Sequence, residues 1–450
     1  MSEEVITEGK ERPRRASFKG TGFLRLWSGE TVSLAGAEVT FMAMGIAAAT
    51  TLAATPWQMG VLEAAESAAV LLLGLSAGVW ADRYERRRIM QLANAGRFLL
   101  VLSVPLLFWL DALTMPVLYA VVFGVGALTL LFDSAMSAYL PRLVPRHQLG
   151  AANSWMEAST SVGSVAGPGL AGLLIQIMSA PFALIVDAVS YLVSSAALAG
   201  LPKAEPGAAD GAGDDEQGDG KQGAAEGAEP ESHRKAVLKG LELLLRDRVQ
   251  RPMVLAAAHF NIFHAMFFSV HTLYVLRVLG FSPALLGATS MAGGVAGLLG
   301  ATSTTTITRF LGQGRALILV YASPGLSAVL VPLAHFSHNK ALAVTLVALS
   351  TFTWTFAVII NLVISETVKQ TLVPDRLLGR VTASTRFISW GVQPVGALLG
   401  GWIGGLIGLS EVMLLAAVGL FTSALWPLLS PVRHLVEAPA PSDTATPDER

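Results

Sequence analysis

The sequence predicts an all-α membrane protein in which twelve transmembrane helices form two pseudo-symmetric bundles of six. Three observations lead to this fold class. The chain of 450 residues is 53% hydrophobic and 14% charged, whereas a soluble domain carries roughly 25% charged residues. Apolar stretches of about 20 residues, the length that crosses a ~30 Å hydrocarbon core, recur along the chain. Finally, landmarks of the first half return in the second half.

The apolar stretches fall into two groups of six. The first group lies in residues 24–201 and the second in residues 252–432. Segment 202–251 opens with a run rich in Ala, Gly, Asp and Glu that cannot bury enough apolar surface to fold, so it is predicted to be a linker. Residues 1–23 and 433–450 are predicted polar tails. The predicted helices lie near residues 25–51, 60–80, 92–110, 116–138, 154–178, 182–201, 253–279, 284–307, 316–334, 341–364, 381–407 and 412–429.

The distribution of basic residues predicts the orientation. Of the 31 Lys and Arg, Arg277 and Lys340 alone fall in turns or helix ends on one side, and Arg97 lies at the edge of a helix. All the others fall on the opposite side. Because Lys and Arg concentrate in short cytoplasmic loops, both termini and the linker are predicted to be cytoplasmic. The chain is therefore expected in the cytoplasmic (inner) membrane as a multi-pass protein.

The two halves share landmarks at a single offset of 229 residues. The related pairs are Pro145 and Pro374, Gly167 and Gly396, Gly172 and Gly401, and Arg86 and Arg315. Repeats of the same orientation place a substrate site between the halves, near the middle of the membrane.

Four motifs carry a resemblance to a known family: the loop after the second predicted helix, the fifth predicted helix, residues 181–191 and residues 370–381. The loop after the second predicted helix matches Gly-x-Leu-Ala-Asp-Arg-x-Gly-Arg-Arg at Gly78, Asp82, Arg83, Arg86 and Arg87. The fifth predicted helix carries a glycine and proline motif at Gly163, Gly167, Pro168 and Gly172. With these motifs the chain resembles the major facilitator superfamily, and more narrowly the exporter branch that includes macrolide efflux and enterobactin export proteins.

The resemblance implies a gating role for the loop. In the family the loop aspartate pairs with the N-terminus of a helix from the other half, which here would be the role of Asp82. A carboxylate at a helix N-terminus is stabilised by about 0.3–1 kcal/mol. The alternative is that the arginines of the loop serve as a topology anchor and nothing more. Likewise, the glycines of the fifth helix serve either close packing or an exporter-specific bend.

Ionisable residues inside membrane helices are costly and are functional candidates by default. Glu38, Glu66 and His264 lie deepest and are the predicted proton-coupling and cavity residues, with Glu38 as the first choice for the proton carrier. The alternative is that they form hydrogen bonds between helices. Secondary candidates, nearer the helix ends or with a structural role, are Glu30, Arg97, Asp133, Glu157, Asp187, His271, Glu366 and Arg380.

The chain lacks the sequence motifs that are typical of other function classes. The chain has no cysteine, which excludes disulfides and thiolate chemistry, and the phosphate-binding loop, the serine elbow and the His-Glu-x-x-His motif are missing. No cofactor, metal site, nucleic-acid partner or enzymatic activity is expected. The predicted function is secondary active transport: proton-coupled export of amphipathic or hydrophobic small molecules by a monomer embedded in membrane lipid. The alternative is transport of lysophospholipids or other lipids by the same fold.

Overall fold

The computed structural model describes the backbone of residues 18, 20–202, 244, 246–373 and 375–435. It describes their side chains except those of residues 74–83, 375–377 and 379–380. Most of the predicted linker and both predicted tails lie outside the described residues. Throughout the described part, the regular structure is helical and contains no strand.

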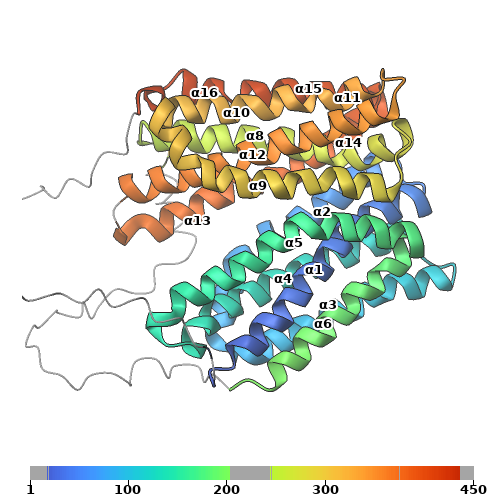
Figure 1. Cartoon of the computed structure of the whole chain (residues 1–450), viewed down its shortest axis with the longest axis vertical. Coiled ribbons are helices and arrows are strands. Elements are labelled where there is room, and N and C mark those ends of the chain that lie inside the picture. The colour runs from blue at the N-terminus through green and yellow to red at the C-terminus, as the bar shows by residue number, and fades with distance from the viewer. Residues whose placement is uncertain (1–17, 19, 203–243, 245, 374, 436–450) are drawn as a thin grey trace, which may run out of the picture.

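The helices form two bundles that lie side by side (Figure 1). The N-terminal bundle consists of α1 (Phe23–Ile46) with η1 (Ala47–Thr51), α2 (Pro56–Arg83), α3 (Arg86–Trp109), α4 (Met115–Leu143), η2 (Arg146–Gln148), α5 (Leu149–Met178) and α6 (Ala180–Ala199). The C-terminal bundle consists of α8 (Gln250–Leu273) with η3 (Tyr274–Val278), α9 (Pro283–Leu311), α10 (Gln313–Ala328), α11 (Leu330–Ala334), α12 (Lys340–Leu372), α13 (Asp375–Gly391), α14 (Gln393–Ile407), α15 (Leu409–Thr422), α16 (Leu425–Leu428) and η4 (Pro431–His434).

These helices make up twelve membrane spans. Ten helical segments of the described chain are long and apolar enough to cross a membrane. Helix α2 and the pair α13–α14 complete the six spans of each bundle. The predicted fold class is therefore confirmed. Three predicted spans are interrupted: 316–334 at Val329, 381–407 at Val392, and 412–429 at residues 423–424. At Val392 the cause is Pro394 at the start of α14, which has no N–H to continue the helix ladder.

The internal repeat is visible in the helix boundaries. Helices α1 and α8 begin at residues 23 and 250, and α2 and α9 at residues 56 and 283, so each pair is 227 residues apart. Helices α6 and α15 begin at residues 180 and 409, which are 229 apart. The repeat therefore has the predicted offset of 229 in its last part and a slightly shorter one in its first part.

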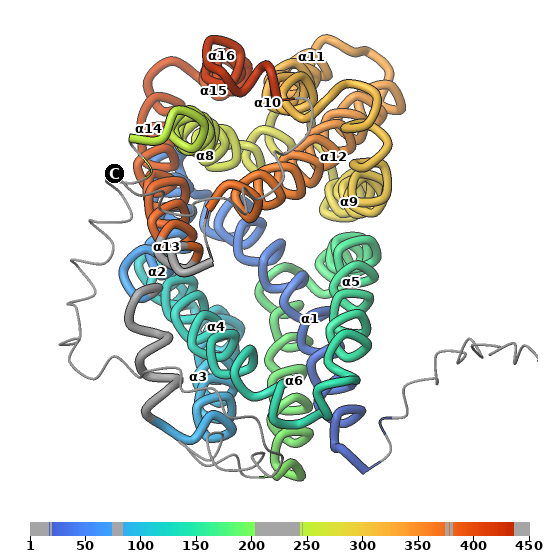
Figure 2. Tube along the Cα trace, turned by 90° about the vertical axis from the view of Figure 1, so that its left-hand side faces the viewer, coloured from blue at the N-terminus to red at the C-terminus, as the bar shows by residue number. Residues whose placement is uncertain are grey.

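The two bundles touch near one end and diverge toward the other. The main contacts between them join α5 to α9 and α2 to α14. Figure 1 shows the bundles separating toward the left-hand side, and Figure 2 looks at the molecule from that side. We call the end at which α1 begins and α12 finishes the open end, and the end at which α2 and α9 begin the closed end.

Asp187 of α6 joins α1 to α6 in the N-terminal bundle. Its carboxylate is fully buried and accepts hydrogen bonds from Oγ1 of Thr40, at 2.5 Å, and from Oγ of Ser190, at 2.8 Å. The backbone of α1 approaches here at Gly36, where a Cβ atom would lie 2.4 Å from Oγ of Ser190. A buried carboxylate needs such partners, and here they join α6 to α1.

Candidate functional site

Three adjoining cavities occupy the space inside and between the bundles. The N-terminal cavity, of about 470 Å³, is enclosed mainly by α1 and α4. The central cavity, of about 410 Å³, lies between α2 of one half and α8 and α12 of the other. The C-terminal cavity, also about 410 Å³, lies among α8, α12 and α13. Glu66 lines the first two cavities and His264 the last two, so these residues mark the junctions.

The central cavity brings together ionisable residues from both halves. Glu63 and Glu66 of α2 face it from the N-terminal bundle, and His264 and His271 of α8 face it from the C-terminal bundle. Residues three apart on a helix share a face, as do residues seven apart, and each pair therefore reaches the same space. Glu66 and His264, two of the three predicted cavity residues, thus lie on the walls of one cavity.

The remaining wall of the central cavity is aromatic and apolar. Trp354 of α12 packs against Phe267 and Phe268, with ring centroids 5.2 Å away in each case. His264 lies 5.5 Å from the same indole. Met59 and Leu62 are among the apolar residues of α2 that line the cavity. A few ionisable groups within an apolar and aromatic surface are typical of a site for small molecules.

A close approach of backbones from α5 and α9 shuts the cavity at the closed end. A Cβ atom on Gly172 would lie 2.5 Å from the carbonyl oxygen of Pro283 and 3.0 Å from Cα of Gly287. Such a contact excludes every residue other than glycine unless the helices move apart. Gly172 belongs to the predicted glycine and proline motif, and so does Pro168, whose carbonyl oxygen faces Gly287.

The same arrangement recurs between α14 and α2. A Cβ atom on Gly401 would lie 2.6 Å from the carbonyl oxygen of Pro56 and 2.9 Å from Cα of Gly60. In both contacts the glycine of one half packs on the first turn of a helix from the other half. The predicted relation between Gly172 and Gly401 therefore corresponds to two equivalent contacts across the interface.

A hydrogen bond adds to this closure. Nη2 of Arg277 donates to the carbonyl oxygen of Ala49 at 2.6 Å. Arg277 lies in the π-helical turn η3 that follows α8, and Ala49 lies in η1, the corresponding turn that follows α1. A π turn leaves carbonyl groups out of the regular helix ladder, which makes them available to partners from other segments.

The N-terminal cavity is lined by Glu30, Arg97 and Asp133, which come from α1, α3 and α4. The side chain of Arg97 is buried, with its guanidinium 4.5 Å from the ring centroid of Phe132 and 4.6 Å from that of Tyr191. A buried cation and two acidic residues therefore share one cavity of the N-terminal bundle. Three of the secondary candidates thus meet at one place.

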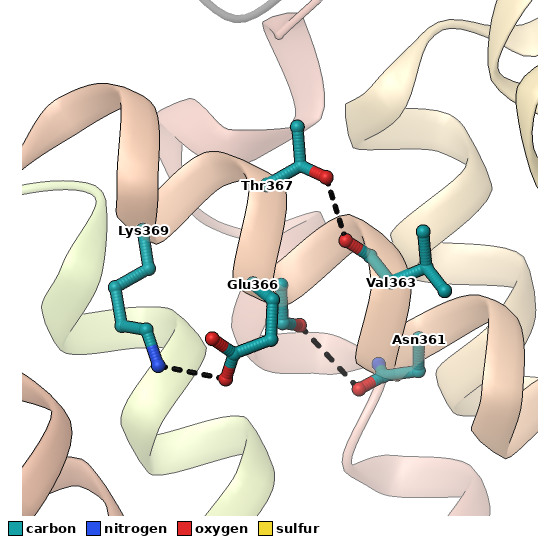
Figure 3. A network of polar contacts seen from close by, with 6 residues as sticks. Asn361, Val363, Glu366, Thr367 and Lys369 are labelled. Atoms are coloured by element: carbon teal, nitrogen blue, oxygen red, sulfur yellow. Dashed lines mark hydrogen bonds and ion pairs between the residues drawn. The ribbon is translucent and has the colours of Figure 1, made fainter. Parts of the chain in front are cut away.

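The C-terminal cavity contains an ion pair that is drawn in Figure 3. Nζ of Lys369 lies 2.7 Å from Oε1 of Glu366, one turn earlier on α12. The lysine side chain is 7% exposed and the glutamate 46%. Glu366 was predicted as a candidate, whereas its partner Lys369 was not.

The other predicted residues lie away from the cavities or cannot be placed. Glu38 packs against Gly167, where an added Cβ would lie 2.5 Å from its Cγ, and it is not among the residues that line the three cavities. Glu157 is exposed on α5. A Cβ on Gly163 would meet nothing within 4 Å. Among the predicted residues, those whose side chains lie outside the described part are Gly78, Asp82, Arg83 and Arg380.

Two arginines of the predicted gating loop are described. Nη2 of Arg87 donates to the carbonyl oxygen of Ala199 at 2.9 Å, and its Nη1 donates to that of Leu201. These bonds hold the start of α3 against the end of α6 within the N-terminal bundle. Arg86 begins α3 at the same place. The described part of the loop therefore stabilises one bundle, while the gating role of Asp82 stays a prediction.

Glu63 was not singled out from the sequence, although it lies in the central cavity. Its signal was its spacing of three residues from Glu66, which places both carboxylates on one helix face. The position of a residue along a membrane span predicts its depth in the membrane. It does not predict which way the side chain points, so it could not show that this face of α2 turns toward the C-terminal half.

The chain matches a family over most of its length. Residues 26–392 fit the family model described as Major Facilitator Superfamily. The chain belongs to this superfamily. Because its members are transporters, the cavities between the halves of this superfamily protein are the candidate path of a small molecule, and the chain is not an enzyme.

The chain is also similar to two individual relatives and to one solved structure. The multidrug efflux pump Tap of Mycolicibacterium fortuitum is 25% identical over 388 residues, which cover 81% of this chain and 87% of that protein. The uncharacterised transporter YfiS of Bacillus subtilis is 29% identical over 182 residues, 40% of this chain and 42% of that protein. A bacterial homologue of the iron transporter ferroportin, crystallised in an inward-facing state, superposes with a TM-score of 0.67 at 14% identity, covering 90% of this chain and 98% of that one.

Proposed function

We propose that this superfamily member exports amphipathic or hydrophobic small molecules across the cell membrane in exchange for protons. The observation that carries the proposal is the central cavity, in which two carboxylates and two imidazoles from opposite halves share an apolar, aromatic wall. The aromatic wall suits the apolar part of a substrate, and the ionisable groups suit a proton or a polar part.

Alternating access explains how the two bundles would move the substrate. The glycine contacts seal one end, and the bundles diverge toward the other. In related transporters, access to the site alternates as one half rocks against the other around it. With the predicted orientation, the open end faces the cytoplasm, from which an exporter loads its substrate.

Glu66 is the residue that we propose for the proton. Depth in the sequence favoured Glu38, but the packing of Glu38 against Gly167 leaves less room for a proton and a substrate to compete there. Glu66 lies at the junction of two cavities and reaches the space that His264 also lines. Glu63, on the same face of α2, is available as its partner.

Export of drug-like compounds is supported by one relative. Tap, which matches over most of both chains, is named a multidrug efflux pump. Lipid transport is the second candidate, and buried Arg97 is the group that favours it, because it could bind a phosphate. Glu30 and Asp133 line the same cavity and would repel an anionic head group, which makes lipid the weaker candidate.

Reconstitution tests the proposed function. Purified protein in liposomes is expected to concentrate a fluorescent hydrophobic cation, ethidium, when a pH difference is imposed, and to lose this when an uncoupler collapses the difference. Empty liposomes are the control. If transport is unchanged by the uncoupler, proton coupling is wrong. If a fluorescent lysophospholipid moves and ethidium does not, lipid is the substrate.

The orientation is tested on intact cells, where the lack of native cysteine makes the experiment direct. We expect single cysteines at Thr55 and Asp111 to react with an impermeant thiol reagent, because both positions follow the predicted outer ends of helices. A cysteine at Gln217, in the linker, is expected to react after lysis and not before. Labelling of the linker on intact cells without labelling at Thr55 would reverse the predicted topology.

A further inference from the structure

The C-terminal cavity concentrates buried polar atoms that have no partner. Within the described residues, five such atoms line it. They are Nε2 of Gln250, Nδ1 of His264, Nδ2 of Asn361, Oγ1 of Thr385 and Oγ of Ser389. Buried polar groups in proteins are almost always hydrogen-bonded, since leaving one without a partner is costly. A cluster of them around one cavity indicates that a ligand supplies the missing partners.

The residues of the cluster are held in place from three helices. Gln250 and Ser389 are 6% and 4% exposed, so the lipid phase and bulk water cannot satisfy them. Thr385 and Ser389 are four residues apart and therefore share a face of α13. Asn361 accepts a hydrogen bond from Oγ of Ser365 through its Oδ1, at 3.4 Å. Its amide nitrogen interacts with the side chain of Tyr321 without a hydrogen bond of good geometry.

The chemistry of the cluster defines the ligand. Two of the side chains offer amide N–H groups, and two offer hydroxyls that both donate and accept. Groups of this kind are satisfied by hydroxyl, ether and carbonyl oxygens. Trp390, which also lines the cavity, adds an apolar surface for the face of a ring.

The charge in the buried part of the cavity is already balanced. Lys369 is paired with Glu366 at 2.7 Å, and the remaining cation of the lining, Arg386, is exposed. Among the described residues of the lining, no unpaired buried cation is present to bind an anionic group. Such a group would also lose its hydration on entering the cavity. The cavity therefore favours an uncharged group.

We propose that the C-terminal cavity is a subsite for the uncharged, oxygen-rich part of the substrate, and that a glycosyl group is the class that fits it. The inference rests on the proposed transport of amphipathic molecules, whose apolar part would occupy the adjoining central cavity. The two cavities share His264, so a molecule that extends past this residue would fill both.

Equilibrium binding with matched probes tests the subsite. The full chain, purified into lipid nanodiscs, is titrated with 4-methylumbelliferyl glucoside, with its anionic glucuronide counterpart, and with 7-ethoxy-4-methylcoumarin, which has no sugar. We expect the glucoside to bind about tenfold more tightly than the sugar-free compound, since each net hydrogen bond changes affinity by roughly two- to tenfold. The glucuronide is expected to bind more weakly than the glucoside.

Variants assign the effect to the cluster. Asn361→Leu and Ser389→Ala are each expected to weaken glucoside binding about three- to tenfold, and to leave the affinity for the sugar-free compound unchanged. Ser327→Ala is the matched control, because Ser327 is buried and bonded to the carbonyl oxygen of Pro324, outside the cavity.

Three results would overturn the subsite: equal affinity for glucoside and sugar-free compound, tighter binding of the glucuronide, or variants that weaken all probes alike. Because binding is measured without a gradient, failure of proton coupling in liposomes leaves this test unaffected. Conversely, transport of ethidium with no preference for the glucoside would sustain the function and remove the subsite.

Discussion

Glu66→Gln is expected to abolish proton-driven concentration of substrate and to leave substrate binding intact. Glutamine keeps the shape of a protonated carboxyl group but cannot release a proton. The transporter would then be held in its proton-loaded form while the aromatic wall around Trp354 still accepts the apolar part of a substrate. The measurement is uptake into liposomes under an imposed pH difference, together with equilibrium binding of the same dye.

Glu38→Gln is the matched comparison. The two glutamates carry the same change, but Glu38 packs against Gly167 of α5, whereas Glu66 lines two cavities. We expect Glu38→Gln to retain gradient-driven uptake. If instead Glu38→Gln eliminates gradient-driven uptake and Glu66→Gln preserves it, then Glu38 carries the proton, as its depth in the membrane predicts, and Glu66 does not. Glu63→Gln tests whether the neighbouring carboxylate shares the proton.

Gly172→Val is the second substitution with a large expected effect: transport should fall to background while the protein still inserts in the membrane. A Cβ at this position would lie 2.5 Å from the carbonyl oxygen of Pro283, so α5 and α9 could not close. The bundles would remain separated at the closed end. The direct measurement is thiol labelling of a cysteine introduced at Leu52, which should react faster in the variant.

The same helix provides the control. Gly163→Ala adds a Cβ that meets nothing within 4 Å, and in a helix alanine is about 1 kcal/mol more favourable than glycine. Transport should therefore be unchanged. Gly401→Val, at the equivalent contact with Pro56, should reproduce the loss seen for Gly172→Val. Normal transport in both valine variants would mean that the two contacts do not have to close during the cycle.

The fold could be predicted from the sequence because lipid imposes a simple length and polarity rule. Each long apolar stretch is helical, as one helix or as two consecutive helices, and the two groups of six form the two bundles. The repeat was recognised from a few landmarks, and its offset held near Gly172 and Gly401. Its first part differs by two residues, because α12 is four residues longer than α4, with 33 against 29 residues, while segment 313–334 is two residues shorter than α3. An offset taken from one region cannot detect such a local insertion.

The site was predicted less completely, for a physical reason. Glu66 and His264 were recognised because ionisable groups are costly in a membrane at any orientation. Their shared cavity depends on how the halves dock, which no single helix encodes. The polar cluster of the C-terminal cavity gave no signal at all. Asn361 and Ser389 are ordinary polar residues in separate helices, and it is their lack of partners after folding that distinguishes them.

The glycine contacts at the closed end also bear on how well the protein insulates the membrane. A proton-driven transporter wastes the gradient if water can pass through its closed side, since a file of water molecules conducts protons. Water needs a space of roughly 10–15 Å³, and side chains that pack imperfectly leave such gaps. Here main chain meets main chain, with Cα of Gly287 and Gly60 against their opposing glycines. At these two contacts the barrier to leakage is made by backbone atoms, whose fit does not depend on the rotamer of any side chain.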